Sequence, residues 1–271
     1  MIAFAANSLL TRGALDRHLI DAPSFTLIRL ISGAFMLALL LAVRPSGRPD
    51  GSVSPDRGSW SSALSLAGYA VAFTLAYMSI GAGVGALLLF GAVQVTMIGT
   101  GIARGDRPLS RDWLGLALAM AGLAWLTVPG ASAPDVTGAA LMVIAGVCWG
   151  AYSIAGRGSR DPLAVTTGNF WRASILAVVA LGVLAARGQV TTRGALLATA
   201  SGALASGVGY TLWYAALPAL GAWRASLVQL TVPILTGFAA ALLLNESISQ
   251  RLVIAGVLVT TGVWITLQRA R

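Results

Sequence analysis

Long apolar runs, interrupted by short polar connections, occupy almost the whole chain. A helix needs about 20 apolar residues to cross the hydrocarbon core of a bilayer. Cutting the sequence at clusters of charge, proline and glycine leaves segments of roughly that length, without the alternating pattern of a membrane β-barrel. The pattern predicts ten membrane-spanning helices, over residues 1–15, 24–43, 60–80, 84–103, 112–129, 137–156, 163–186, 194–217, 221–244 and 250–268.

Two short motifs recur in the same order in both halves of the chain. They are Thr74-Leu75-Ala76-Tyr77 with Thr211-Leu212-Trp213-Tyr214, and Val93-Gln94-Val95-Thr96 with Val228-Gln229-Leu230-Thr231. Repeats in register inside a hydrophobic chain are typical of a duplicated membrane bundle, whose binding site lies where the halves meet. We therefore divide the chain into residues 1–130 and residues 131–271.

Each half would hold five of the ten predicted helices. Because five is an odd number of crossings, the second half enters the membrane from the opposite side, and the repeats are inverted. The sequence therefore predicts an all-α membrane protein of ten transmembrane helices, arranged as two inverted five-helix repeats around a central cavity.

Composition supports a membrane protein and explains the net charge. Hydrophobic residues make up 57% of the chain and charged residues 10%, with a mean hydropathy of +0.82, whereas soluble domains carry about 25% charged residues. The net charge of +9 comes from 18 arginines without any lysine. Most of these lie in connections, where they contact lipid headgroups. We therefore expect the lipid bilayer, and no nucleic acid, as the partner of this charge.

The arginines also orient the chain. Connections on the side of the N-terminus, together with the C-terminal end, carry ten arginines, and the opposite side carries five. Because arginine-rich connections remain in the cytoplasm, we expect a multi-pass protein with both termini cytoplasmic. Tryptophans near the span ends are expected to anchor the chain at the membrane surface, namely Trp60, Trp113, Trp125, Trp223 and Trp264.

An aromatic face lies on one predicted helix of the second half. Tyr210, Trp213 and Tyr214 are spaced i, i+3 and i+4, which places them on one side of that helix. Phe73 and Tyr77 repeat part of this pattern in the first half. These rings either line a substrate cavity with apolar, cation–π and hydroxyl contacts or only pack between helices. The hydroxyls that need partners favour the cavity.

Two amide side chains, Gln94 and Gln229, lie near the middle of predicted helices, and each is followed two residues later by threonine. A polar side chain at that depth needs a polar partner or water. As equivalent positions of the repeat, they either face each other across a central pathway or hold two helices together. Pro233 frees the backbone carbonyl of Gln229 and is expected to kink its helix.

A third candidate face combines Trp149 and Tyr152 with Asn7, which corresponds to Tyr152 under the repeat. Packing alone would also explain Trp149, but it explains the set less well.

Arg29 and Arg172 lie several residues inside predicted helices, where an unpaired cation is costly. They either bind a carboxylate of the substrate or, as such arginines more often do, reach the membrane surface or helix-end carbonyls.

Carboxylates are placed outside the middle of every predicted span. All nine fall in connections or at a helix end, namely Asp16, Asp21, Asp50, Asp56, Asp106, Asp112, Asp135, Asp161 and Glu246. Proton-coupled antiporters commonly carry a titratable group in mid-membrane, so this placement favours facilitated transport. His18, in the first connection, is expected in a solvated turn and not in a metal site. We expect no metal, no cofactor and no enzymatic activity.

These features resemble a known transporter family. Gly105-Asp106 and Asn245-Glu246, at the ends of two equivalent helices, and Pro233 are similar to the EamA-type, ten-helix members of the drug/metabolite transporter superfamily. The resemblance covers nearly the whole chain. Within it, residues 91–99 and 228–233 look like the YddG-type exporters of aromatic amino acids and methyl viologen. The chain departs from the family at Asp106, where the family usually has glutamate.

The resemblance implies an exporter in a bacterial inner membrane, with a central cavity that opens alternately to either side. We expect a monomer that works by facilitated, uniport-like transport. Its expected small-molecule substrates are aromatic and other neutral amino acids, related metabolites and cationic drugs. The expected substrate-binding residues are Asn7, Tyr77, Gln94, Trp149, Tyr152, Tyr210, Trp213, Tyr214 and Gln229.

Two other functions stay open. A nucleotide-sugar or phosphate-ester antiporter of the same superfamily would need cations in the cavity, for which Arg29 and Arg172 are the candidates. A membrane-embedded transferase or hydrolase would need a nucleophile or an acidic metal cluster at the membrane surface. The scattered aspartates do not form such a cluster in the sequence.

Overall fold

The computed structural model describes residues 1–15, 17–44, 57–76, 79, 82–128, 135–244 and 248–268. Its helices are α1 (Ile2–Leu15), α2 (Ala22–Val43), α3 (Trp60–Ala76), α4 (Ala82–Ala103), α5 (Ser110–Thr127), α6 (Val136–Gly156), α7 (Pro162–Ala185), α8 (Thr192–Ala200), the π-helix η1 (Ser201–Val208), α9 (Gly209–Gln229), α10 (Thr231–Leu244) and α11 (Gln250–Leu267). Elsewhere the described residues form turns and connections, with one isolated β-bridge between Ile20 and Val190. The described part of the chain is all-helical, as the hydropathy pattern predicts.

Apolar composition and length identify the membrane-crossing part of this fold. Among the described residues, six helical segments are long and apolar enough to span a membrane, and shorter apolar helices occupy residues 60–76 and 231–243. Such segments keep every backbone hydrogen bond within the helix, which hydrocarbon requires. The chain is therefore a multi-pass membrane protein.

Two breaks interrupt the long helical stretch of the second half. Within α9, Gly221 has φ 70° and ψ 172°, a backbone conformation that glycine adopts readily because it has no Cβ. The second break is at Leu230, between α9 and α10, three residues before Pro233. Pro233 cannot donate a hydrogen bond to the carbonyl of Gln229, and the helix is interrupted there, although Leu230 keeps helical backbone angles.

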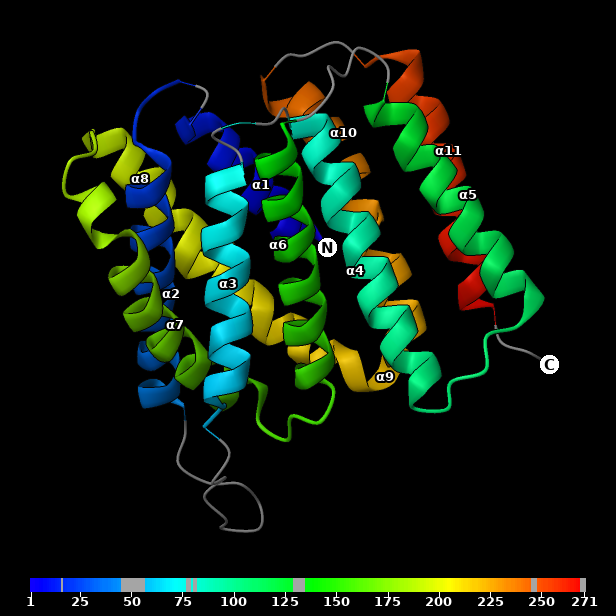
Figure 1. Cartoon of the computed structure of the whole chain (residues 1–271), viewed down its shortest axis with the longest axis horizontal. Coiled ribbons are helices and arrows are strands. Elements are labelled where there is room, and N and C mark those ends of the chain that lie inside the picture. Colours follow the sequence, from blue (N-terminus) through cyan, green and yellow to red (C-terminus); the bar gives the residue numbers. More distant parts are fainter. Residues whose placement is uncertain are drawn as a thin grey trace.

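The helices pack in pairs that join the two predicted halves. In Figure 1, α2, α3, α6 and α7 lie together on one side, and α5 lies beside α11 at the opposite edge. The main neighbours include α2 with α7, α3 with α6, α4 with α6 and α5 with α11, while α1 contacts α8, η1 and α10. Every one of these pairs takes one helix from each half, so the halves are interleaved and do not form separate lobes.

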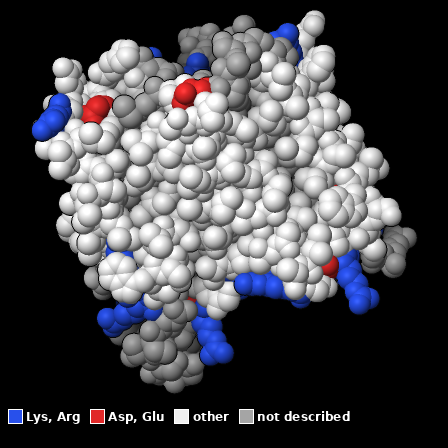
Figure 2. Space-filling model, in the orientation of Figure 1, with Lys and Arg blue, Asp and Glu red and all other residues white. Residues whose placement is uncertain are grey.

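Connections and charges gather at two opposite ends of the bundle. The connections after α4 and α6 lie at one end, at the bottom of Figure 1, and those after α1 and α7 lie at the other. Figure 2 shows arginines and acidic residues near these two ends of the visible face, with a broad uncharged band between them. The band is the surface expected to contact lipid tails.

Several aspartates begin helices. Asp21 accepts a hydrogen bond from the backbone N–H of Ser24 at 2.9 Å, and Asp135 and Asp161 cap α6 and α7 in the same way. A carboxylate at a helix N-terminus satisfies free N–H groups and the helix dipole. Asp161 also forms a two-fold ion pair with Arg44 at 2.9 Å, and this hydrogen bonding raises the pKa of Arg44. Asp16 and Glu246 lie outside the described residues.

The tryptophans expected at the membrane surface divide into two groups. Four are substantially exposed, as an anchor requires: Trp60, Trp113, Trp125 and Trp264. Trp223 differs, because its exposed fraction is 9% and its ring packs on Trp113 with 4.9 Å between ring centroids. Its position near a span end suggested an anchor, but the kink at Gly221 turns this part of α9 into the bundle.

Glycine allows α5 and α11 to approach closely. A Cβ atom added at Gly262 would overlap the backbone oxygen of Gly115 and would lie 2.9 Å from the backbone nitrogen of Ala119. Small residues at helix interfaces are how membrane helices gain packing contacts without a hydrophobic driving force. The seam along α5 and α11 therefore depends on the absence of side chains at these positions.

We expect Gly262→Ala to destabilise the folded protein by about 1–3 kcal/mol, the usual cost of overpacking. The measurement is the melting temperature of the purified protein in detergent. Gly91→Ala is the matched control, because a Cβ at Gly91 meets nothing within 4 Å and alanine is the better helix former. Equal melting temperatures for the two variants would contradict the seam.

Candidate functional site

Five aromatic side chains meet at the centre of the bundle. Tyr210, Trp213 and Tyr214 from α9 have exposed fractions of 3%, 4% and 0%, and their i, i+3, i+4 spacing turns all three to one side. Trp149 and Tyr152 from α6 lie against them, with centroid separations of 4.8 Å for Trp149–Tyr210 and for Tyr152–Tyr214. We call these five residues the central aromatic cluster. The structure thus brings together side chains that the sequence placed on two separate faces.

A sixth ring, from α1, lies inside this cluster. Phe4 is in edge-on contact with Trp149, Tyr210 and Trp213, at centroid separations of 5.5, 5.5 and 5.8 Å. Edge-to-face contact directs the positive edge of one ring at the negative face of another, which is favourable for aromatic pairs. Three side chains of the cluster therefore form a cage whose shape fits one aromatic ring.

The polar edges of the cluster are hydrogen-bonded within it. Trp213 donates from Nε1 to Ser153 Oγ at 3.2 Å, and Tyr214 donates from its hydroxyl to the backbone oxygen of Tyr152 at 2.8 Å. Gly156, one turn further along α6, leaves room for the Tyr214 ring, which a Cβ at that position would approach to 2.5 Å. These bonds fix the rotation of α9 against α6.

The two glutamines tie α4, α6 and α9 together. Gln229 accepts a hydrogen bond from Nε1 of Trp149 and donates from Nε2 to Met97 Sδ of α4 at 3.3 Å. Gln94, on α4, donates from Nε2 to the backbone oxygen of Ser226 on α9 at 2.8 Å. In this conformation the glutamines hold helices together and are not hydrogen-bonded to each other. The buried Gln94 Oε1 has no hydrogen-bond partner among the described residues.

Of the two arginines, only Arg29 belongs to the centre. Its exposed fraction is 4%, and it donates to Ser206 Oγ at 2.8 Å and to the Tyr210 hydroxyl at 2.5 Å. Arg172 instead donates to the backbone oxygens of Arg57 and Gly168 at 2.8 and 3.0 Å. Arg172 therefore binds carbonyls near the start of α7, and Arg29 is a cation inside the bundle.

The remaining expected residues do not join the cluster. Asn7 is buried on α1, but it accepts a hydrogen bond from Ser201 at the start of η1. Tyr77 lies outside the described residues. Trp171, inside α7, is 39% exposed and packs on Phe35.

Three residues of the site were not singled out from the sequence: Phe4, Tyr69 and Ser206. Tyr69 is 5.0 Å from Trp149 between ring centroids, and the Arg29 guanidinium carbon lies 5.9 Å from its ring. The spacing of Tyr69 to Phe73 and of Ser206 to Tyr210 is i, i+4 in both cases, which was the available signal. Phe4 offered none, because a phenylalanine in an apolar helix is ordinary.

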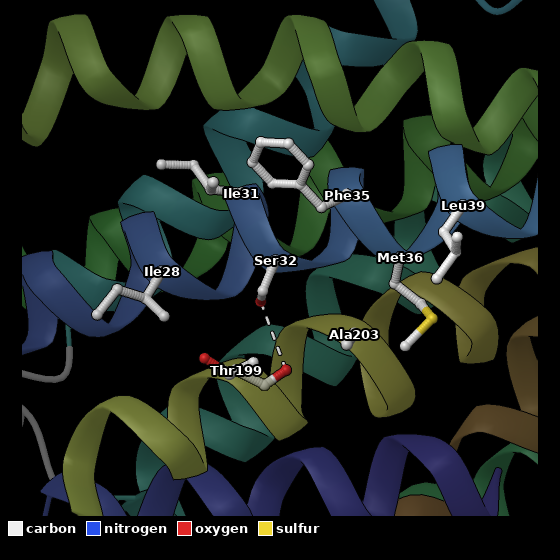
Figure 3. Close-up of a pocket in the computed structure, with 8 residues that line it drawn as sticks. All are labelled: Ile28, Ile31, Ser32, Phe35, Met36, Leu39, Thr199 and Ala203. Carbon is white, nitrogen blue, oxygen red and sulfur yellow. Dashed lines mark hydrogen bonds between the residues drawn. The ribbon is translucent and has the colours of Figure 1, made fainter. Parts of the chain in front are cut away.

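The structure shows an open groove on another face of the bundle. It has a volume of about 510 Å³, and its apolar walls come from α2, α8 and η1 (Figure 3). Its lining residues are Ile28, Ile31, Ser32, Phe35, Met36, Leu39, Thr199 and Ala203. Phe35 and Leu39 are more than half exposed, so the groove faces lipid. At the centre of the bundle, where the sequence predicts a cavity, Phe4 packs against the rings of the cluster.

The described residues also offer little for metal chemistry. Within them, no group of three or more histidine, cysteine, aspartate or glutamate side chains is placed to hold a metal ion. His18 lies in the turn after α1 with φ 51°, in agreement with the turn expected there. The polar chemistry of the centre is that of hydroxyl, indole, amide and guanidinium groups.

Comparison with known proteins relates this chain to a transporter family. The model of the EamA-like transporter family matches residues 136–268. Uncharacterized protein PA1977 of Pseudomonas aeruginosa is 52% identical over 269 residues, which cover 98% of this chain and 91% of that protein. A protein of known crystal structure, 18% identical, superposes with a TM-score of 0.80 over 98% of this chain and 94% of its own. At that identity the likeness concerns the fold.

The hydrogen bond between Trp149 and Gln229 can be tested by Trp149→Phe, which keeps an aromatic ring and removes the N–H group. We expect a loss of about 1–3 kcal/mol of stability, because the buried Gln229 Oε1 is left without its donor. The measurement is the melting temperature in detergent. Trp171→Phe is the control, since that side chain is 39% exposed. An equal effect of both substitutions would argue against the bond.

Proposed function

Because this chain belongs to the EamA-like transporter family, within the drug/metabolite transporter superfamily, we propose that it exports amino acids from the bacterial cytoplasm. The substrates are aromatic and other neutral amino acids and related small metabolites or drugs. The protein acts as a monomer in the inner membrane, with both termini cytoplasmic. The substrate enters the centre of the bundle, at the central aromatic cluster.

The edge-on contacts of Phe4 carry this proposal. Three rings of the cluster surround one phenylalanine side chain at 5.5–5.8 Å. The aromatic ring of a free phenylalanine, tyrosine or tryptophan could contact these three rings in the same way. Phe4 then occupies the position of the substrate ring in this closed conformation, and α1 moves aside when substrate binds. Trp149, Tyr210 and Trp213 contact the substrate directly.

The helix neighbours support transport by alternating access between two inverted repeats. Under the repeat, α1 corresponds to α6, α3 to α8 with η1, and α4 to α10. The contact of α3 with α6 therefore has its counterpart in the contact of α8 and η1 with α1. The contact of α4 with α6 has its counterpart in the contact of α10 with α1. α2 with α7 and α5 with α11 are pairs of equivalent helices, also in contact. A bundle with this symmetry has two equivalent arrangements, in which the centre opens to one side or to the other.

Transport is facilitated and uniport-like. The described carboxylates cap helices or lie at helix ends, as Asp21, Asp135 and Asp161 illustrate. Proton coupling through a carboxylate would need one in the substrate pathway. A nucleotide-sugar or phosphate-ester substrate is less well supported, because Arg172 binds backbone carbonyls away from the cluster and leaves Arg29 as the cation there.

Reconstituted liposomes test the transport activity. We expect saturable uptake of phenylalanine without an imposed proton gradient. Trp213→Ala should lower this uptake at least about tenfold, since loss of ring contact and apolar burial exceeds 1.4 kcal/mol. Trp171→Ala, which removes an exposed tryptophan, should leave uptake unchanged. Absence of amino-acid uptake by the unmodified protein would refute the substrate class. If the Trp213→Ala variant does not fold, Trp213 serves to pack the helices together and not to bind substrate.

Orientation is tested by cysteine labelling in whole cells. In a Cys148→Ala background, which removes the one natural cysteine, a membrane-impermeant maleimide should label Arg187→Cys and spare Arg104→Cys. Both positions are exposed and lie in connections at opposite ends of the bundle. The reverse pattern would place the termini outside.

A further inference from the structure

Arg29 is a buried cation in the first half of α2, and the groups that it contacts are uncharged. Its guanidinium donates to the hydroxyls of Ser206 and Tyr210 and lies 5.9 Å from the centre of the Tyr69 ring. Hydroxyl and ring contacts only partly replace the hydration of a cation, so a charge at membrane depth is expensive and marks function. Packing needs alone do not explain why an arginine stands there.

The protein does not neutralise this charge within its described part. Asp161 pairs with Arg44, and Asp21 and Asp135 begin helices at the ends of the bundle. All contacts that the structure gives Arg29 end on uncharged groups. Arg172 makes the comparison clear, because it also lies inside its helix but binds the backbone oxygens of Arg57 and Gly168. An anion that pairs with Arg29 would therefore come from outside the described chain.

The local helix geometry directs Ser206 and Tyr210 at Arg29. Ser206 lies in the π-helix η1, and Tyr210 follows four residues later. Gly202, one turn before Ser206, brings η1 against α2 so closely that an added Cβ would overlap the backbone oxygen of Arg29. π-helical turns are uncommon and often occur at functional sites. Here the turn holds two hydroxyls on the guanidinium without supplying an opposite charge.

Tyr210 connects this cation to the ring cage. Its hydroxyl accepts the hydrogen bond of Arg29, and its ring is in edge-on contact with Phe4. A molecule whose ring takes the place of Phe4 would therefore have Arg29 close by, across one tyrosine side chain. An aromatic ring with a carboxylate a few bonds away is the chemical description of an aromatic amino acid.

We propose that Arg29 is the residue of the transporter that binds the carboxylate of the substrate. This inference rests on the proposed function. The planar guanidinium matches the two oxygens of a carboxylate, which it binds through parallel N–H···O bonds. Ser206 and Tyr210 hold the guanidinium in place before substrate arrives, as pre-organised sites do. The substrate then neutralises a charge that the empty bundle leaves uncompensated.

The test compares two ligands that differ only at the carboxylate: phenylalanine and phenylalaninamide, in which a neutral amide replaces it. Binding to the purified protein is measured by isothermal titration calorimetry. We expect the unmodified protein to prefer phenylalanine at least about tenfold, as expected for a charged hydrogen bond. Arg29→Gln should bind both ligands with similar affinity, and Arg29→Lys should keep part of the preference. Arg172→Gln, the control, should keep all of it.

Several results would overturn the assignment. They are equal binding of the two ligands by the unmodified protein, binding of neither, or a preference that survives in Arg29→Gln. If Arg29→Gln does not fold, the preference for phenylalanine over phenylalaninamide is compared between the unmodified protein and Arg29→Lys. Octanoate carries the carboxylate on an alkyl chain; if it binds as tightly as phenylalanine, the site takes a lipid-derived acid. A carboxylate preference without uptake into liposomes would sustain the Arg29 site and refute the export function.

Discussion

Polar groups inside an apolar bundle have to satisfy one another, because neither lipid nor bulk water is there to do it. This constraint selects the contacts at the centre of the molecule. The indole of Trp149 is paired with Gln229, the hydroxyl of Tyr214 with a backbone carbonyl, and the guanidinium of Arg29 with hydroxyls. Each bond joins two helices and sets the rotation of one against the other. The position of the aromatic cluster follows from those rotations.

The same constraint bears on the alternating access that we propose. The glutamine ties are single hydrogen bonds between α4, α6 and α9, and a substrate with its own donors and acceptors can replace them. Phe4 contributes ring contacts without hydrogen bonds, so it can leave at the cost of apolar contact alone. The close glycine seam between α5 and α11 lies at the edge of the bundle. In the proposed mechanism the contacts at the centre are the ones that change, whereas this seam stays tightly packed.

Much of the architecture follows from local patterns. Most helix positions agree with the hydropathy cuts, because apolar runs and helix breakers act within one segment. The predicted helices 194–217 and 221–244 differ, since the structure divides this stretch into α8, η1, α9 and α10. Gly221 and Pro233 lie at the two breaks of the second half, since glycine tolerates a positive φ and proline lacks the N–H that a helix needs. Trp149, Tyr152, Tyr210, Trp213 and Tyr214 were expected at the site and do lie together. Trp223 was misplaced, because a position near a helix end does not specify which way the side chain turns.

The sequence by itself determined the membrane class, the helices and the types of side chain that hydrocarbon burial makes significant. It treated Arg29 and Arg172 alike, since both are cations several residues inside an apolar helix. Only the tertiary structure separated them, because Arg29 meets the hydroxyl of Ser206, 177 residues away, and Arg172 meets the backbone carbonyls of Arg57 and Gly168. Such meetings depend on how helices rotate and cross, which the packing of the whole bundle sets. For the same reason Phe4 became part of the site only in the folded molecule.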